Sequence, residues 1–250
     1  MFTIIDVDHT YLEQDFYRER QVQWLKLSDL HGINGYCEGE AADAVRKRLA
    51  ASLPTPIHFC GNGNYHYLSY FMLEQLQEAF TLVLFDHHSD MQPSLFGEIL
   101  SCGSWVKWAL DHNPCLKQVV MLGVGEESAA AIEEEYQTRV TVIGEEELAD
   151  TVRIERTIEG IEDPIYISLD KDVFAPEVAE TNWDQGRMKL KQWEDICRLL
   201  AARRPVIGAD VCGEYVLEGD DFTHMKKAAL ENGKVNGRIL EVLEDCLYRG

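Results

Sequence analysis

Aspartate and histidine gather in three short segments of this 250-residue chain, GNGNYH, DHHSD and SLDKD. The six candidate metal ligands in these segments are His66, Asp86, His88, Asp90, Asp170 and Asp172. Carboxylates brought together in a buried place repel one another unless cations neutralise them. A mixed set of carboxylates and imidazoles suits Mn²⁺, with Zn²⁺, Fe²⁺ or Co²⁺ as alternatives. The residue types therefore predict a divalent-metal centre.

The three segments each follow a short apolar run of the kind that forms a buried strand. IHFC precedes GNGNYH, LVLF precedes DHHSD, and IYISL precedes the Asp-Lys-Asp triplet. In open α/β sheets the carboxyl ends of the strands line the ligand crevice, so the six side chains should meet at one edge. If the strand continues through DHHSD, Asp86, His88 and Asp90 point the same way. By the same alternation Lys171 points away from its two aspartate neighbours.

Apolar runs alternate with amphipathic stretches along the rest of the chain, which predicts a mostly parallel sheet covered by helices on both faces. We expect strands at residues 3–7, 57–60, 81–85, 118–123, 140–143, 165–169 and 206–211. Helices are expected at residues 40–51, 65–79, 101–111, 127–136, 145–159 and 189–202. Residues 222–247 read as one or two helices broken near residues 233–237. The fold class is α/β, a three-layer α/β/α sandwich, and one domain spans residues 1–250.

The composition of the chain restricts the kinds of molecule it is expected to bind and the compartment in which it is expected to occur. The net charge of −21 argues against nucleic acid and anionic membranes, which are bound largely through clustered Lys and Arg, and favours a cationic substrate. No basic leader and no apolar stretch of roughly 20 residues is seen, so neither a signal peptide nor a membrane span is expected. The seven cysteines are scattered and odd in number, which is typical of a reducing cytoplasm and not of a disulfide framework.

The order and spacing of the three segments resemble those of the ureohydrolase family, which comprises arginases, agmatinases and formimidoylglutamases. That family places a His after a glycine-rich loop, then D-x-H-x-D, then D-x-D in an S-x-D-x-D context. The resemblance implies a single arginase-like metallohydrolase domain with two divalent ions, Mn²⁺ being favoured. One ion would take His66, Asp86, Asp90 and Asp170. The other would take Asp86, His88, Asp170 and Asp172, so that Asp86 and Asp170 bridge.

The chemistry implied by the resemblance is hydrolysis of a linear carbon–nitrogen bond by a metal-bridging hydroxide. The substrate class is a small cationic guanidino or amidino compound, and Asp90 would orient the hydroxide. Family members are commonly oligomeric, so a homo-oligomer is expected.

The chain departs from the family pattern at two places that bear on the substrate. Cys102 in LSCGSW stands where arginases and agmatinases carry a catalytic His, and we expect its thiol to open onto the metal crevice at the start of a helix. Glu214 lies four positions after Asp210, whereas the family's guanidinium-binding acid lies three after its Asp. The resemblance therefore implies catalytic roles for Asp90, Cys102 and Glu214, and Cys102 should alter substrate choice.

Two other classes of function remain open. DVDHT resembles the D-x-D-x-T nucleophile motif of Mg²⁺-dependent haloacid-dehalogenase phosphatases, with Asp6 and Asp8 as the key acids. In the alternative interpretation Asp6, Asp8 and His9 line the rim of the same crevice and contact substrate. The chain could also be a ureohydrolase-like binding protein without catalysis.

Overall fold

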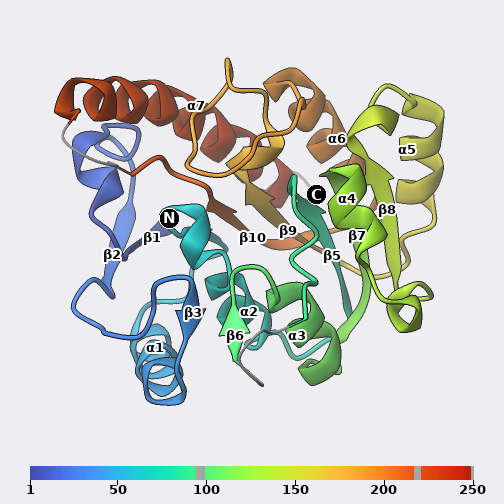
Figure 1. Ribbon diagram of the computed structural model, residues 1–250, viewed down its shortest axis with the longest axis horizontal. Helices are drawn as coiled ribbons and strands as arrows, with labels where there is room; N and C mark the ends of the chain where they lie inside the picture. The colour runs from blue at the N-terminus through green and yellow to red at the C-terminus, as the bar shows by residue number, and fades with distance from the viewer. Residues whose placement is uncertain (94–98, 217–220, 249–250) are drawn as a thin grey trace.

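A single parallel sheet of eight strands forms the centre of the molecule (Figure 1). The computed structural model describes residues 1–93, 99–216 and 221–248. The strand order is β2-β1-β4-β10-β9-β5-β7-β8. Their bounds are β1 Phe2–Asp6, β2 Val22–Lys26, β4 Ile57–Phe59, β5 Phe80–Phe85, β7 Leu116–Val124, β8 Val140–Gly144, β9 Ile165–Asp170 and β10 Val206–Cys212. The central strands are apolar and buried on both faces, as parallel strands with helices on either side must be.

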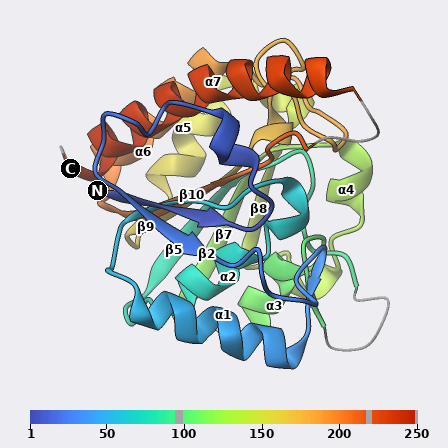
Figure 2. The ribbon, with the colours of Figure 1, turned by 90° about the vertical axis from the view of Figure 1, so that its left-hand side faces the viewer.

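Helices cover both faces of this sheet, which gives the predicted three layers (Figure 2). One face carries α1 Gly39–Ala51, α2 Leu68–Leu73 and α3 Trp105–His112. The other carries α5 Thr151–Glu159, α6 Leu190–Arg203 and α7 Phe222–Tyr248. A short helix, α4 Glu126–Ala130, follows β7, and five 3₁₀ turns complete the order. They are η1 Thr10–Glu13, η2 Gly63–Tyr65, η3 Glu134–Tyr136, η4 Glu145–Glu147 and η5 Lys171–Val173. Two hydrophobic clusters, one on each side of the sheet, form the core.

The seven expected strands are all present, and the structure adds three that were missed. The edge strand β2 has only one buried residue, so its sequence shows little apolar patterning. The other two are the two-residue strands β3 Tyr36–Cys37 and β6 Leu100–Ser101, which pair antiparallel outside the main sheet. Strands this short have no periodicity that a sequence could reveal.

Four of the helical expectations need correction. The helix predicted at residues 145–159 divides into η4 and α5. The helix predicted at residues 65–79 is confined to α2, and the one at 127–136 divides into α4 and η3. The break predicted near residues 233–237 is wrong, because α7 is one continuous helix. A glycine within a helix costs about 1 kcal/mol relative to alanine, and the burial of apolar residues of α7 such as Leu240 and Leu243 outweighs that cost.

Candidate metal centre

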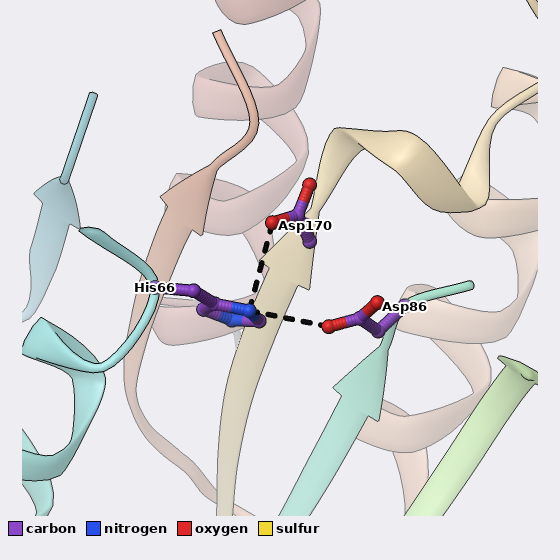
Figure 3. A group of neighbouring side chains, drawn as sticks. All are labelled: His66, Asp86 and Asp170. Carbon is purple, nitrogen blue, oxygen red and sulfur yellow. Dashed lines mark ion pairs between the residues drawn. The ribbon is translucent and has the colours of Figure 1, made fainter. Parts of the chain in front are cut away.

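The register of the central strands brings two of the candidate ligands to the same level of the sheet. Phe85 of β5 pairs with Leu169 of β9, so the residues that follow, Asp86 and Asp170, emerge side by side. His66 arrives from the loop after β4, at the end of η2. Figure 3 shows these three side chains pointing toward one another from three separate elements. The expected meeting at the carboxyl edge therefore occurs.

A first group of donor atoms surrounds the imidazole of His66. Its Nδ1 lies 3.1 Å from Asp86 Oδ2, 3.0 Å from Asp90 Oδ2 and 3.6 Å from Asp170 Oδ2. The side chains of His66 and Asp86 are only 1% exposed. Three carboxylates around one imidazole form a donor set suited to a divalent cation.

A second group adjoins the first and shares one of its members. His88 Nδ1 lies 2.9 Å from Asp172 Oδ2 and 3.5 Å from Asp86 Oδ1. Asp86 thus offers Oδ2 to the first group and Oδ1 to the second. The candidate ligand atoms lie within 4.8 Å of one another among His66, Asp86 and Asp170, and likewise among Asp86, His88 and Asp172. A carboxylate with one oxygen in each of two adjoining groups has the arrangement of a ligand that bridges two ions.

The path of the chain through residues 86–90 differs from the expected continuation of the strand. β5 ends at Phe85, and Asp90 has a left-handed φ of 49°. Backbone donors hold the turn: His88 N–H donates to Asp86 Oδ1 at 2.6 Å, and His87 N–H donates to Asp172 Oδ1 at 3.0 Å. A tight turn, and not strand alternation, therefore brings the three DHHSD ligands together.

Burial and mutual charge shift the pKa values of the site. Burial, together with the charge of neighbouring Asp172, raises the pKa of Asp170 well above its usual value. Burial and Asp86 raise the pKa of Asp172 to about 6. Burial lowers the pKa of His88, but hydrogen bonds to Asp172 and Asp86 outweigh it and raise the pKa to about 12. Burial also lowers the pKa of His66, but hydrogen bonds to Asp86 and Asp90 outweigh it, so that the pKa of this imidazole is raised as well. The cluster thus retains protons that offset the negative charge of its carboxylates when no other cation does so.

All six candidate ligands lie at the floor of one cavity of about 290 Å³. Cys102 lines the same cavity, as expected, and follows β6 two residues before Ser104, the N-cap of α3. Burial, followed by the charge of Asp90, raises the pKa of this thiol to about 11. Cys102 lies outside the first turn of α3, where a helix terminus acts most strongly on the pKa of a thiol.

Comparison with known proteins decides the family. The model of the arginase family matches residues 6–214, most of the chain. The chain belongs to the arginase family. An uncharacterized protein of Thermotoga maritima is 28% identical over 240 residues, which cover 96% of this chain and 88% of the relative.

Solved structures show the same fold as this arginase-family chain. The agmatine ureohydrolase of Thermoplasma volcanium is 17% identical, with a TM-score of 0.67, over 98% of this chain and 88% of the other. The arginase of Bacillus caldovelox is 16% identical, with a TM-score of 0.66, over 94% and 96% of the two chains. At this identity the likeness establishes the arginase fold and leaves the substrate to be inferred from the site.

Behind the ligands of this arginase-family site, buried side chains fix their orientation. Trp105 Nε1 donates to Asp90 Oδ2 at 2.6 Å. His66 Nε2 lies 2.9 Å from Ser168 Oγ, whose hydroxyl donates to Asp210 Oδ1 at 2.7 Å. Such a partner on the second ring nitrogen sets the tautomer and direction of a ligating His. Trp105 is fully buried, and no pattern in the sequence indicates its hydrogen bond to Asp90.

Glu214 is not brought to this cavity. Its carboxylate binds the ammonium group of Lys171 and accepts from Gln14 Nε2 at 2.9 Å and from Asn236 Nδ2 at 2.6 Å. It also accepts from Asn232 Nδ2 at 3.2 Å. The expected direction of Lys171, away from its aspartate neighbours, is explained by this buried network.

The DVDHT segment supports the loop that carries His66. Asp8 Oδ2 accepts from the backbone and side chain of Asn62, at 3.2 and 2.7 Å, and so braces the loop that carries His66. Asp6 Oδ1 lies 3.0 Å from His9 Nδ1. None of these three N-terminal residues is among the described residues that line the cavity. A nucleophilic Asp6 therefore has no support in this family or geometry.

No helix within residues 1–93, 99–216 and 221–248 combines the length and apolar character needed to cross a bilayer.

Proposed function

We propose that this chain is a metal-dependent hydrolase that uses two divalent ions, with Mn²⁺ favoured, to cleave a linear carbon–nitrogen bond of a guanidino or amidino compound. The observation that carries the proposal is the sharing of Asp86 between two adjoining donor groups at the floor of a cavity. Membership of the arginase family supports the reaction class.

The proposed ligand sets are those implied by the family motifs. His66, Asp86, Asp90 and Asp170 hold one ion, and Asp86, His88, Asp170 and Asp172 hold the other. When bound, two such ions supply an activated water by lowering its pKa toward neutrality. We propose that Asp90, anchored by Trp105, orients the attacking group while the other carboxylates balance the ionic charge.

The surroundings of two further residues decide whether each is given a role. Cys102 lines the cavity and takes the place of the family's His, so we propose that it shapes substrate choice or carries a proton. Glu214 is not assigned the guanidinium-binding role expected from its place in the sequence, because its carboxylate is engaged by Lys171 and Asn236.

A cytoplasmic location is part of the proposal. All seven cysteines are free, including Cys102 and Cys115, which are partly exposed. Free thiols persist in reducing compartments and are oxidised readily elsewhere.

The test combines metal analysis with a turnover screen. Purified protein is loaded with Mn²⁺, dialysed and analysed for metal, and is then screened for release of urea, ammonia or amine from guanidino and amidino compounds. Retention of two Mn²⁺ per chain together with release from any member of the panel supports the proposal. A protein that retains no divalent ion contradicts it. A protein that binds both ions and releases product from none is the non-catalytic binding protein.

A further inference from the structure

Aromatic side chains line the cavity whose floor is acidic. Trp183 and Tyr36 both line it and are 41% and 45% exposed. Single exposed aromatic residues are common on protein surfaces. Two that face the same cavity as a cluster of buried carboxylates form a surface on which a ligand can lie. We call Trp183 and Tyr36 the aromatic rim.

Trp183 touches both segments that carry the candidate histidine ligands. Its ring centroid is 5.7 Å from that of His88, at an interplanar angle of 71°. A Cβ at Gly63 would lie 2.7 Å from Trp183 Cδ1, so Gly63 leaves room for the indole against the loop that carries His66. A ligand in contact with this indole is therefore within reach of the metal centre.

The segment that carries Trp183 is held in place by its own hydrogen bonds. Asn182 donates to the backbone oxygen of Val216 at 3.0 Å and accepts from its N–H at 2.8 Å. Thr181 Oγ1 donates to the Trp183 carbonyl at 3.1 Å. An aromatic surface that is already fixed loses little conformational entropy when a ligand binds to it.

Tyr36 belongs to a separate wall of the cavity. It pairs with Ser101 in the β3–β6 sheet, and Cys102 N–H donates to the Gly35 carbonyl at 2.9 Å. In Figure 1 the segment between η5 and α6 lies above the carboxyl edge of the central strands, and β3 and β6 lie below it. The two members of the aromatic rim thus come from different sides of the site.

The charged side chains that line the cavity also restrict the ligand. The described residues that line it include four aspartates and neither Lys nor Arg. Residues 94–98 and 217–220, outside the described part of the chain, contain no Lys or Arg in their sequence. A carboxylate removed from water needs a cationic or hydrogen-bonding partner to offset its desolvation. The imidazoles of His66 and His88 are already engaged by aspartates. The hydroxyls of Ser101 and Ser104 bond to each other, which leaves the neutral amide of Gln92 among the side chains that line the cavity. Aromatic faces instead favour aromatic, alkyl or cationic groups.

We propose that the substrate is a guanidino or amidino compound without a carboxylate, and that its non-reacting end is an aromatic or alkyl group lying against Trp183 and Tyr36. The inference rests on the proposed function and names the substrate class of that same site.

The experiment compares 3-phenylpropylguanidine with 4-guanidinobutyrate, which share the guanidinium and three methylene groups and differ at the far end. Binding to metal-depleted protein is measured by calorimetry, and hydrolysis is measured separately on Mn²⁺-loaded protein. The variants are Trp183→Leu, Trp183→Phe and Tyr36→Leu. The control is Trp24→Leu, since Trp24 is 37% exposed on β2 and does not line the cavity.

The phenyl compound should bind wild type about tenfold more tightly than the carboxylate compound, and Trp183→Leu should remove about tenfold of that affinity. Trp183→Phe should retain most of it, Tyr36→Leu should lose part, and Trp24→Leu should match wild type. Equal binding of the two compounds, or Trp183→Leu binding like wild type, overturns the inference.

The two readouts separate this inference from the proposed function. If binding depends on Trp183 but no compound is hydrolysed, the role of the aromatic rim is supported and the proposed reaction is contradicted. Hydrolysis of the phenyl compound that is as fast in Trp183→Leu as in wild type supports the proposed reaction and contradicts the role of the aromatic rim.

Discussion

The ammonium group of Lys171 is bound to the carboxylate of Glu214 in the interior, and both side chains are 0% exposed. Lys171 stands between Asp170 and Asp172, so the ion pair anchors the backbone that presents two candidate ligands. Asn236 of α7 contacts both charged groups. The pair thereby ties the metal-binding edge of the sheet to the last helix.

Replacement of Lys171 by Met should destabilise the fold strongly, because it leaves the Glu214 carboxylate buried without a cation. Loss of one partner of a buried pair costs about 3–5 kcal/mol in free energy of unfolding. Urea denaturation measures this change in the free energy of unfolding. Lys191→Met is the control, because the Lys191–Asp195 pair is exposed and contributes about 0.3–0.5 kcal/mol. A Lys171→Met variant as stable as its control would contradict the structural role of the pair.

Asp86→Asn should weaken both metal sites, whereas Asp172→Asn should weaken chiefly the one that contains His88. The reason is that Asp86 has one oxygen in each donor group and Asp172 belongs to the second alone. Metal analysis after dialysis should find almost no Mn²⁺ in the first variant and about one ion per chain in the second. Equal metal loss in the two variants would contradict the shared role of Asp86.

Metal uptake should release protons and should strengthen as the pH rises. In metal-depleted protein the pKa of His88 is about 12 and that of His66 is raised, so both imidazoles hold protons at neutral pH. The pKa of Asp172 is about 6, so this carboxyl loses its proton below neutrality. Ions bind the deprotonated groups, and each displaced proton makes the apparent affinity rise about tenfold per pH unit. A pH-indicator dye in weak buffer records the release; uptake without protons would refute the prediction.

Ser168→Ala should weaken metal binding at His66 by about 10- to 100-fold, because the imidazole loses the hydroxyl that orients it. Ser69→Ala is the matched control. Ser69 Oγ also donates to Asp210 Oδ1, at 2.8 Å, whereas Ser69 meets His66 through its backbone N–H, which the alanine variant retains. Competition titration with a metal-sensitive dye compares the two variants. Equal affinities would show that Ser168 serves only packing.

Cys102→Ala should change kcat or KM on the true substrate, since the thiol lines the cavity and, in our proposal, takes the place of the family's His. Cys102→His should raise turnover of arginine or agmatine relative to the unmodified protein. Steady-state kinetics on both variants check this, with circular dichroism as a control for folding. Strong arginine hydrolysis by the unmodified chain would defeat the specificity role while leaving the metal centre intact.

The sequence by itself determined the sheet and the six candidate ligands. Apolar runs such as residues 81–85 and 165–169 can be buried only as strands covered on both faces, so the α/β class follows from local pattern. The polar residues that end these runs must emerge at the carboxyl edge, because parallel strands share one direction. His66, Asp86 and Asp170 were predictable for this reason.

Only the tertiary structure decided which other residues serve the site. Ser168 reaches His66 across 102 positions of sequence, and Trp183 meets Gly63 and His88 through a loop without periodic pattern. Glu214 shows the same limit, because its distance from Asp210 along the chain could not reveal that Lys171 binds its carboxylate. Spacing in sequence constrains neighbours within one strand or turn, whereas the packing of distant elements determines which side chain neutralises a buried charge.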